Sequence, residues 1–149
     1  MKEKLIDAYM KTAETFAELS HARRLHVGAI VVKDDRIISI GYNGMPAGWD
    51  NNCEDEITIE EDEKFIKALK TKPEVLHAET NALAKLAKST ESGANATMFI
   101  THAPCLDCAK LIYQSGINSV FYRDAYRSQD GIQFLQTSGV KVEQTKKDA

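Results

Sequence analysis

The sequence predicts an α/β domain in which helices cover both faces of a mixed five-stranded sheet, a three-layer α/β/α arrangement. Three features of the sequence lead to this prediction. An amphipathic helix and a β-hairpin occupy the first part of the chain, strands alternate with helices in the second half, and no repeat or linker divides the sequence. Hairpin strands are antiparallel, whereas strands that alternate with helices are usually parallel. The 149 residues suit one ordinary domain, so we expect a single domain over residues 1–149.

The first predicted elements are a helix and a hairpin. Apolar residues recur every three or four positions over residues 2–20, which indicates an amphipathic helix. Two runs rich in β-branched and apolar residues follow at 27–33 and 36–42, and Asp34 and Asp35 between them can form a turn. These two runs are therefore predicted to pair as antiparallel strands.

A polar stretch follows the predicted hairpin. Residues 43–56 contain glycines, a proline and several Asn and Asp residues, which predicts a long loop. Loops of this length inside compact domains are usually functional or disordered. Residues 60–70 are predicted to form a short, charged helix that ends before Pro73.

The second half of the chain alternates between two kinds of element. Three helices are predicted over residues 77–88, 105–114 and 131–137, the first from apolar spacing and the other two from the glycines at their ends, Gly116 and Gly139. Three short apolar strands are predicted between and after these helices, over residues 98–101, 119–122 and 140–144. These strands are expected to be parallel to one another.

Composition excludes several classes of protein. Hydrophobic residues make up 43% of the chain and charged residues 28%, which is typical of a soluble globular protein. No apolar run approaches the roughly 18 residues of a membrane span, and no signal-peptide core follows the first residues, so we expect no membrane partner. Two of the three cysteines lie in a C-x-x-C pattern, which favours metal binding in a reducing compartment over disulfides. We therefore expect a cytoplasmic protein.

The net charge of −3 is unevenly distributed. Residues 50–63 contain eight acidic and no basic residues, which leaves 14 acidic against 19 basic residues elsewhere, a net charge of +5. A mildly basic body suits a phosphorylated small molecule, whereas a protein that binds nucleic acid is expected to carry a strong basic stripe. A small-molecule partner and no nucleic acid are therefore expected.

Residues 77–108 contain three good zinc ligands, His77, Cys105 and Cys108, and one nearby acid, Glu79. A structural zinc is held by four protein groups, whereas a catalytic zinc keeps one position for water. Glu79 lies two residues after His77, and such positions do not share a helix face, so we expect it to flank Zn²⁺ as a catalytic acid and base. The alternative is a structural zinc whose fourth ligand is another residue of the chain; the available ones are His21, His26, Cys53 and His102.

The patterns H-A-E and P-C-L-D-C resemble the signature of zinc-dependent nucleobase deaminases, H-x-E with P-C-x-x-C. Nearly the whole chain resembles the deoxycytidylate (dCMP) deaminases of the cytidine deaminase superfamily. Four segments carry this resemblance, residues 24–29, 41–48, 77–82 and 104–110, and the Gly-Tyr-Asn-Gly-x-Pro loop is the most discriminating. The resemblance implies a cytidine deaminase-like fold and one zinc-dependent deaminase domain. It also implies hydrolysis of dCMP to dUMP and ammonia, which supplies dUMP for thymidylate synthesis.

The resemblance further implies which residues contact the nucleoside part of dCMP. Asn43 and the backbone near it would hold the sugar. The amide of Ala78 would bind the base carbonyl, and the backbone around Ala103 would accept a hydrogen bond from the exocyclic amine. Tyr126 is expected to stack on the base, and Arg127 to reach the phosphate.

The loop after the first helix is expected to bind the 5′-phosphate, because Ser20 and Arg24 match the pattern of the family there. Guanidinium groups bind phosphate through two parallel hydrogen bonds, which is the physical basis of this assignment. A second assignment gives the contact to Arg23 in place of Arg24. Both assignments stay open at the level of the sequence.

Regulation is implied in the same way. Many members of the family are oligomers that dCTP activates and dTTP inhibits, with the triphosphate and Mg²⁺ near the Gly-Tyr-Asn-Gly loop. By resemblance, Tyr42, Asn43 and Gly44 are candidates for this regulatory site, and a homo-oligomer is expected. Some relatives hold a second, structural zinc with two cysteines. Here Cys53 matches one position, but Ala22 occupies the other, so no second zinc is expected.

Other activities share the zinc signature. A tRNA adenosine deaminase or a single-strand cytidine deaminase would need a basic, aromatic groove, which the overall acidity disfavours. A deaminase of guanine, free cytidine or a riboflavin precursor is a second alternative. A non-catalytic binding module is a third.

Overall fold

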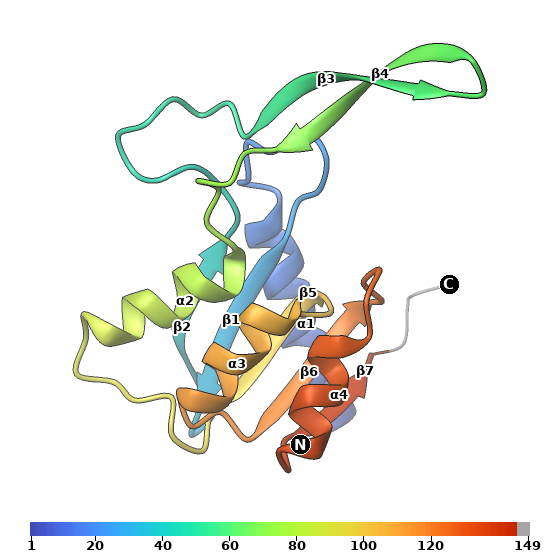
Figure 1. The fold of residues 1–149 in the computed structure, drawn as a ribbon. Coiled ribbons are helices and arrows are strands. Elements are labelled where there is room, and N and C mark those ends of the chain that lie inside the picture. The colour runs from blue at the N-terminus through green and yellow to red at the C-terminus, as the bar shows by residue number, and fades with distance from the viewer. Residues whose placement is uncertain (146–149) are drawn as a thin grey trace.

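The computed structural model describes residues 1–145 and contains a central sheet flanked by helices (Figure 1). The sheet has five strands in the order β2-β1-β5-β6-β7. Their bounds are Gly28–Lys33 for β1, Arg36–Tyr42 for β2, Thr97–His102 for β5, Ser119–Asp124 for β6 and Lys141–Gln144 for β7. Strand β1 is antiparallel to both β2 and β5, whereas β5, β6 and β7 are parallel. The predicted mixed five-stranded sheet is therefore confirmed.

Helices form a layer on each face of this sheet. Their bounds are Glu3–Ala17 for α1, Ala78–Ala87 for α2, Leu106–Gln114 for α3 and Asp130–Thr137 for α4. Successive residues of a strand point to opposite faces, so Ile30 belongs to the apolar cluster of α1 and Val31 to the cluster of the other helices. This arrangement confirms the three layers. None of the helices within residues 1–145 combines the length and the hydrophobicity needed to cross a membrane.

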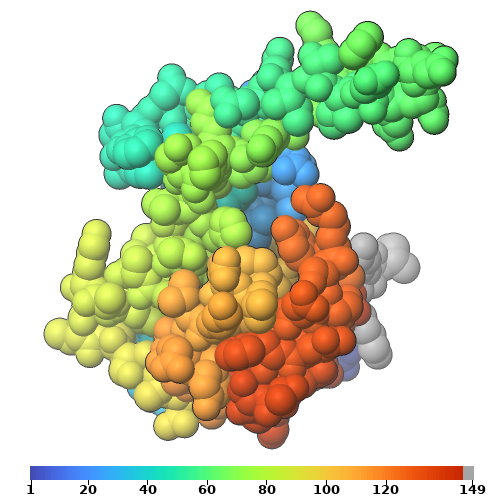
Figure 2. All heavy atoms as spheres, in the orientation of Figure 1, coloured from blue at the N-terminus to red at the C-terminus, as the bar shows by residue number. Residues whose placement is uncertain are grey.

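A two-stranded hairpin occupies the region in which a helix was predicted over residues 60–70, so that prediction is wrong. Strands β3 (Glu54–Glu61) and β4 (Lys64–Thr71) pair with each other in a sheet of their own. The hairpin extends away from the rest of the molecule (Figures 1 and 2). The long loop predicted over residues 43–56 consequently ends at residue 53.

The sequence of this hairpin explains its conformation. Ile57 and Ile59 alternate with charged and polar residues, which is the period of two that a strand requires. Asp62 and Glu63 take φ values of 51° and 61°, as the two-residue turn of a β-hairpin demands. The apolar residues of β4, at positions 65, 66, 68 and 69, have helical spacing instead, so the sequence alone does not reveal this strand.

Two glycines allow helices to lie close to the sheet. A Cβ on Gly28 would overlap the backbone oxygen of Ala13 in α1, and a Cβ on Gly41 would overlap the backbone oxygen of Ala78 in α2. The second contact concerns the helix that directly follows His77. The position of α2 therefore depends on the missing side chain of Gly41.

Gly41→Ala is expected to lower the free energy of unfolding by about 1–3 kcal/mol, because the backbone of α2 must move away from β2. Urea unfolding measures this change. Gly44→Ala is the matched control, since a Cβ there meets no atom within 4 Å. Equal stability of the two variants would contradict the tight packing of α2 on β2.

Candidate active site

The three predicted zinc ligands converge at the beginnings of two helices. His77 is the N-cap residue of α2, Cys105 is the N-cap residue of α3, and Cys108 lies in the first turn of α3. His77 Nδ1 lies 3.2 Å from Cys108 Sγ and 3.7 Å from Cys105 Sγ. All three potential ligand atoms lie within 4.8 Å of one another. Within residues 1–145, no other His, Cys, Asp or Glu belongs to this group.

Zn²⁺ fits this set of donors. With bonds of about 2.3 Å to sulfur and about 2.0 Å to nitrogen, two ligands of a tetrahedral zinc lie roughly 3.5 Å apart. The two N–S separations of 3.2 and 3.7 Å lie on either side of this value. Three protein donors leave the fourth position of the tetrahedron for water. The group therefore favours a catalytic zinc over a structural one.

Hydrogen bonds within the group make one of its thiols acidic. The hydrogen bonds of Cys105 with Cys108 and with His77 lower the pKa of the Cys105 thiol to about 4. Cys105 also lies at the N-terminus of α3, where the partial positive charge of the helix favours a thiolate. Because zinc binds the thiolate, this environment prepares Cys105 as a ligand.

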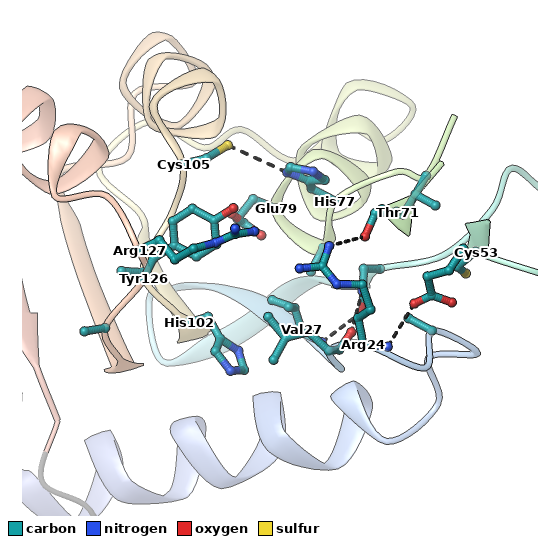
Figure 3. A pocket seen from close by; sticks show the side chains of 18 residues that line it. Arg24, Val27, Cys53, Thr71, His77, Glu79, His102, Cys105, Tyr126 and Arg127 are labelled. Atoms are coloured by element: carbon teal, nitrogen blue, oxygen red, sulfur yellow. Dashed lines mark hydrogen bonds between the residues drawn. The ribbon is translucent and has the colours of Figure 1, made fainter. Parts of the chain in front are cut away.

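Glu79 lies in the first turn of α2, and its side chain is buried, with 5% of the residue exposed. Burial raises the pKa of its carboxyl group above the usual value. A raised pKa brings a carboxyl group closer to the range in which it can both accept and donate a proton, as an acid–base catalyst must. Glu79 lines the same cavity as His77 and Cys105 (Figure 3). The geometry thus places an acid beside the ligand group and outside it.

A cavity of about 350 Å³ adjoins the metal-ligand group. Its walls come from the loop after α1, the residue after β2, the base of the β3–β4 hairpin, the start of α2, the end of β5 and the loops after β5 and β6. Ligands of such sheets bind beyond the carboxyl ends of the parallel strands, and this cavity lies at those ends of β5 and β6. Six of the predicted substrate-binding residues line it: Arg24, Asn43, Ala78, Ala103, Tyr126 and Arg127. Figure 3 shows Arg24, Tyr126 and Arg127 around the same space as Glu79.

Three of the predicted substrate-binding and regulatory residues are absent from the cavity wall that residues 1–145 form, namely Ser20, Tyr42 and Gly44. The hydroxyl of Ser20 accepts a hydrogen bond from the N–H of Ala22 at 3.2 Å and so shapes the turn after α1. The carbonyl of Tyr42 accepts one from Asn81 Nδ2 at 2.8 Å. Gly44 pairs with Leu76 through two backbone hydrogen bonds of 3.1 and 2.8 Å. These contacts place all three in the framework around the cavity.

Asn43 lines the cavity, but its side chain is engaged with the protein backbone. Its Oδ1 accepts a hydrogen bond from the N–H of Val27 at 2.9 Å. Its Nδ2 donates one to the carbonyl of Leu25 at 2.8 Å. Asn43 therefore fixes the segment that enters β1 in addition to any contact with a ligand.

The structure separates the two arginines between which the sequence did not decide. Arg24 lines the cavity, and its Nη1 donates a hydrogen bond to Thr71 Oγ1 at 3.0 Å (Figure 3). Arg23 turns toward β3, where its Nη2 donates to Asn52 Oδ1 at 2.9 Å and its Nε lies 3.6 Å from a carboxylate oxygen of Glu54. Arg24 is therefore the better placed of the two for a substrate anion.

Several residues of the wall were not identified from the sequence as part of the site. Glu54 and Thr71 belong to the hairpin, and Val75 follows it. No motif marks them, because they reach the cavity only through the pairing of β3 with β4. His102 also lines the cavity, and its Nδ1 forms a 2.9 Å hydrogen bond with Thr101 Oγ1, which suits a supporting residue.

Known proteins are similar to this chain in fold and in sequence. A sequence model described as the cytidine and deoxycytidylate deaminase zinc-binding region matches residues 3–124. The solved dCMP deaminase of cyanophage S-TIM5, in complex with dCMP and dUMP, is 49% identical with a TM-score of 0.86, over 97% of this chain and 99% of that chain. ComE operon protein 2 of Bacillus subtilis (strain 168) is 36% identical over 94% of this chain and 70% of its own length. The deoxycytidylate deaminase of Enterobacteria phage T4 is 31% identical over 78% of this chain and 77% of its own length.

The fold, the His-Cys-Cys group and these matches together define a zinc-binding hydrolytic deaminase. The chain belongs to the cytidine and deoxycytidylate deaminase family. The family that the sequence motifs indicated is thereby confirmed, along with the class of enzyme.

Proposed function

We propose that this protein hydrolyses dCMP to dUMP and ammonia. The observation that carries the proposal is that one cavity brings together the metal-ligand group, the buried Glu79 and Arg24. The metal-ligand group and Glu79 suit hydrolysis at a ring carbon that bears an amine, and Arg24 suits the binding of a phosphate. The cyanophage relative, solved with dCMP and dUMP, supports the same substrate. The product, dUMP, would supply thymidylate synthesis. The enzyme would act in the cytoplasm, and residues 1–149 would form a single deaminase domain.

The residues around the metal would divide the chemistry between them. His77, Cys105 and Cys108 would hold Zn²⁺, which supplies a water activated for attack on C4 of the pyrimidine. Glu79 accepts a proton from the attacking water and donates it to ring nitrogen N3 as the C4–O bond forms. Glu79 then transfers the proton of the C4 hydroxyl to the amino group as the C4–N bond breaks, and ammonia leaves.

The walls of the cavity offer contacts to the base and the sugar. The amide of Ala78 would donate to the base carbonyl, and the backbone at Ala103 would accept from the exocyclic amine. Tyr126 would stack on the ring. The backbone around Asn43, with the spare hydrogen-bonding capacity of its side chain, would hold the sugar.

The cations of the cavity would bind the 5′-phosphate. Arg24 and Arg127 both line the cavity, and guanidinium groups match the geometry of phosphate oxygens. Ser20 would support this contact by shaping the turn that leads to Arg24. The phosphate would thus distinguish the substrate from a free nucleoside.

We also propose a regulatory site for dCTP and dTTP with Mg²⁺ at Tyr42, Asn43 and Gly44, in a homo-oligomer. The position of these residues supports the proposal, since Tyr42 and Gly44 flank Asn43, which lines the cavity. A triphosphate held there would act on the substrate through Asn43.

The test of the proposed function is an ammonia-release assay of the zinc-loaded protein on dCMP, CMP and deoxycytidine. We expect kcat/KM for dCMP to exceed that for deoxycytidine at least about 100-fold, because two hydrogen bonds between charged groups, each worth about 1.5 kcal/mol, are lost with the phosphate. Equal values for dCMP and deoxycytidine would contradict the proposal. Faster release from RNA or single-stranded DNA would assign a nucleic-acid deaminase instead.

The same assay tests the regulatory site. With Mg²⁺ present, dCTP is expected to raise and dTTP to lower the rate at dCMP concentrations below KM. A dCMP saturation curve that neither triphosphate changes would remove this part of the proposal and leave the catalytic part intact.

A further inference from the structure

Glu54 is a buried acid that the proposed chemistry does not use. It is the first residue of β3, and 1% of it is exposed. Acids are rarely buried to this extent unless hydrogen bonds satisfy them. Its Oε2 accepts hydrogen bonds from the backbone N–H groups of Arg23 and Arg24, each at 2.9 Å, and its Oε1 accepts from Arg23 at 3.2 Å. The carboxylate therefore holds the loop after α1 by two consecutive peptide groups.

Strand β4 contacts the same loop through its last residue. Thr71 is the register partner of Glu54 in the hairpin. Its Oγ1 accepts the hydrogen bond from Arg24 Nη1 at 3.0 Å, and Figure 3 shows this bond at the cavity. Glu54 thus fixes the backbone of Arg24, and Thr71 fixes its guanidinium group. The cross-strand pair Glu54–Thr71 therefore contacts both the backbone and the guanidinium group of Arg24.

The same acid keeps the neighbouring arginine turned toward the hairpin. Arg23 Nε lies 3.6 Å from Glu54 Oε1, and its Nη2 donates to the carbonyl of Glu54 at 3.2 Å and to Asn52 Oδ1 at 2.9 Å. These contacts leave Arg23 outside the part of the cavity wall that residues 1–145 form. Glu54 therefore contacts both adjacent arginines, and of the two only Arg24 lines the cavity wall formed by residues 1–145.

We propose that Glu54 is a positioning residue that presents Arg24 to the anionic group of the substrate. This inference rests on the proposed function, in which the anion is the 5′-phosphate of a nucleotide. An arginine that is already held in place loses less side-chain freedom when it binds phosphate. Loss of the Glu54 carboxylate should therefore weaken binding of the phosphorylated substrate and leave the chemical step unchanged.

Glu54→Gln tests the proposal, because it keeps the size of the side chain but removes its charge and replaces one of the two acceptor oxygens with an amide donor. KM for dCMP is expected to rise about tenfold, the effect of losing one hydrogen bond of a charged group, while kcat stays within about twofold. The kcat/KM for deoxycytidine should not change. Equal losses on both substrates would indicate a merely structural role and would overturn the proposal.

Whether KM for dCMP rises or falls in Glu54→Gln distinguishes a positioning role of Glu54 from a direct effect of its negative charge on the phosphate. Removal of a negative charge near the phosphate would by itself strengthen binding of dCMP, so a lower KM in Glu54→Gln would also refute the proposal. Glu56→Gln is the matched control. Glu56 lies on the same strand with an exposed side chain, and the nearest guanidinium atom of Arg23 lies 4.0 Å away. This control removes the same charge and should leave KM within about twofold of the wild type.

A double-mutant cycle shows whether Glu54 acts through Arg24. Arg24→Ala alone is expected to raise KM for dCMP about tenfold or more, as the loss of a charged hydrogen-bond donor does. Adding Glu54→Gln to Arg24→Ala should then cause no further loss, because residues that act as one unit are not additive. Additive losses would mean that Glu54 affects binding by another route and would count against the proposal.

Titration with inorganic phosphate provides a readout that needs no turnover. The NMR signals of the Arg24 guanidinium group in the zinc-loaded protein are expected to respond at about tenfold lower phosphate concentration in the wild type than in Glu54→Gln. If the wild type does not deaminate dCMP, the proposed function fails, and this titration still judges the role of Glu54. Equal phosphate affinities of the wild type and Glu54→Gln would overturn the proposed positioning role of Glu54.

Discussion

Glu79→Gln is expected to lower kcat for dCMP by about 10⁴-fold while the protein keeps its zinc. General acid–base catalysis contributes about 10²–10⁴-fold, and Glu79 is proposed to move a proton in two successive steps, which places the effect at the upper end. Glutamine has nearly the size of glutamate, but its amide cannot accept and return a proton. Ammonia release measures kcat, and elemental analysis measures the zinc content.

The zinc content of these variants shows whether Glu79 is an acid–base catalyst or a ligand of the metal. Glu79 lies outside the group formed by His77, Cys105 and Cys108. Both Glu79→Gln and Glu79→Ala should therefore retain as much zinc as the wild type. Zinc lost in proportion to activity would make Glu79 a ligand, and the proposed proton transfers would fail.

Cys108→Ala is expected to lose its zinc and to lower kcat by about 10³-fold or more. A catalytic zinc contributes several kcal/mol to stabilisation of the transition state, and each 1.36 kcal/mol corresponds to a factor of about ten in rate. The variant leaves two of the three donors, which come from different helices. Activity and zinc content are measured as for Glu79.

Cys53→Ala is the matched control for this change. Cys53 and Cys108 are similarly buried, with 1% and 2% of the residue exposed, so both substitutions remove a packed sulfur atom. Only Cys108→Ala should lose zinc, because Cys53 lies outside the ligand group. Loss of zinc from Cys53→Ala would reveal a second zinc, which the alanine at position 22 argues against.

Removal of zinc should also lower the thermal stability of the wild type. The metal would join the start of α2 to the start of α3, so its binding free energy stabilises the folded chain. At a free zinc concentration about 1,000-fold above Kd, this stabilisation is about 4 kcal/mol, which corresponds to a decrease in Tm on the order of 10 °C after chelation. Cys108→Ala should show no response to the chelator.

The sequence predicted the parts of the molecule that depend on local patterns. The two runs of β-branched and apolar residues at 27–33 and 36–42 and the alternation of strands and helices after residue 97 were enough to predict the central sheet. The metal-ligand group was equally accessible, because His77 and Glu79 lie in one helical turn and Cys105 and Cys108 in another. Their types and spacing already carry the chemistry of a zinc site.

Other features depend on contacts between distant residues and could not be predicted in this way. The side chain of Asn43 bonds to the backbone of Leu25 and Val27, a contact that no pattern around residue 43 announces. The contacts of Arg23 and Arg24 with Glu54 join residues some thirty positions apart in the chain, so no local pattern reveals them. The short helix predicted over residues 60–70 was wrong because the apolar residues of β4 have helical spacing, and only their pairing with β3 makes this segment a strand.

The hairpin β3–β4 has a consequence for how the chain folds. Strand β2 packs against α2, and roughly half of the residues between these two elements lie in the hairpin. Because Glu54 and Thr71 are paired at its base, a formed hairpin shortens the loop that must close to bring α2 onto β2. Halving such a loop lowers the entropic free energy of closure by about 0.6 kcal/mol, and a hairpin forms within about 1–10 μs. The tip at Asp62 can accordingly gain or lose residues at little cost to the assembly of the cavity.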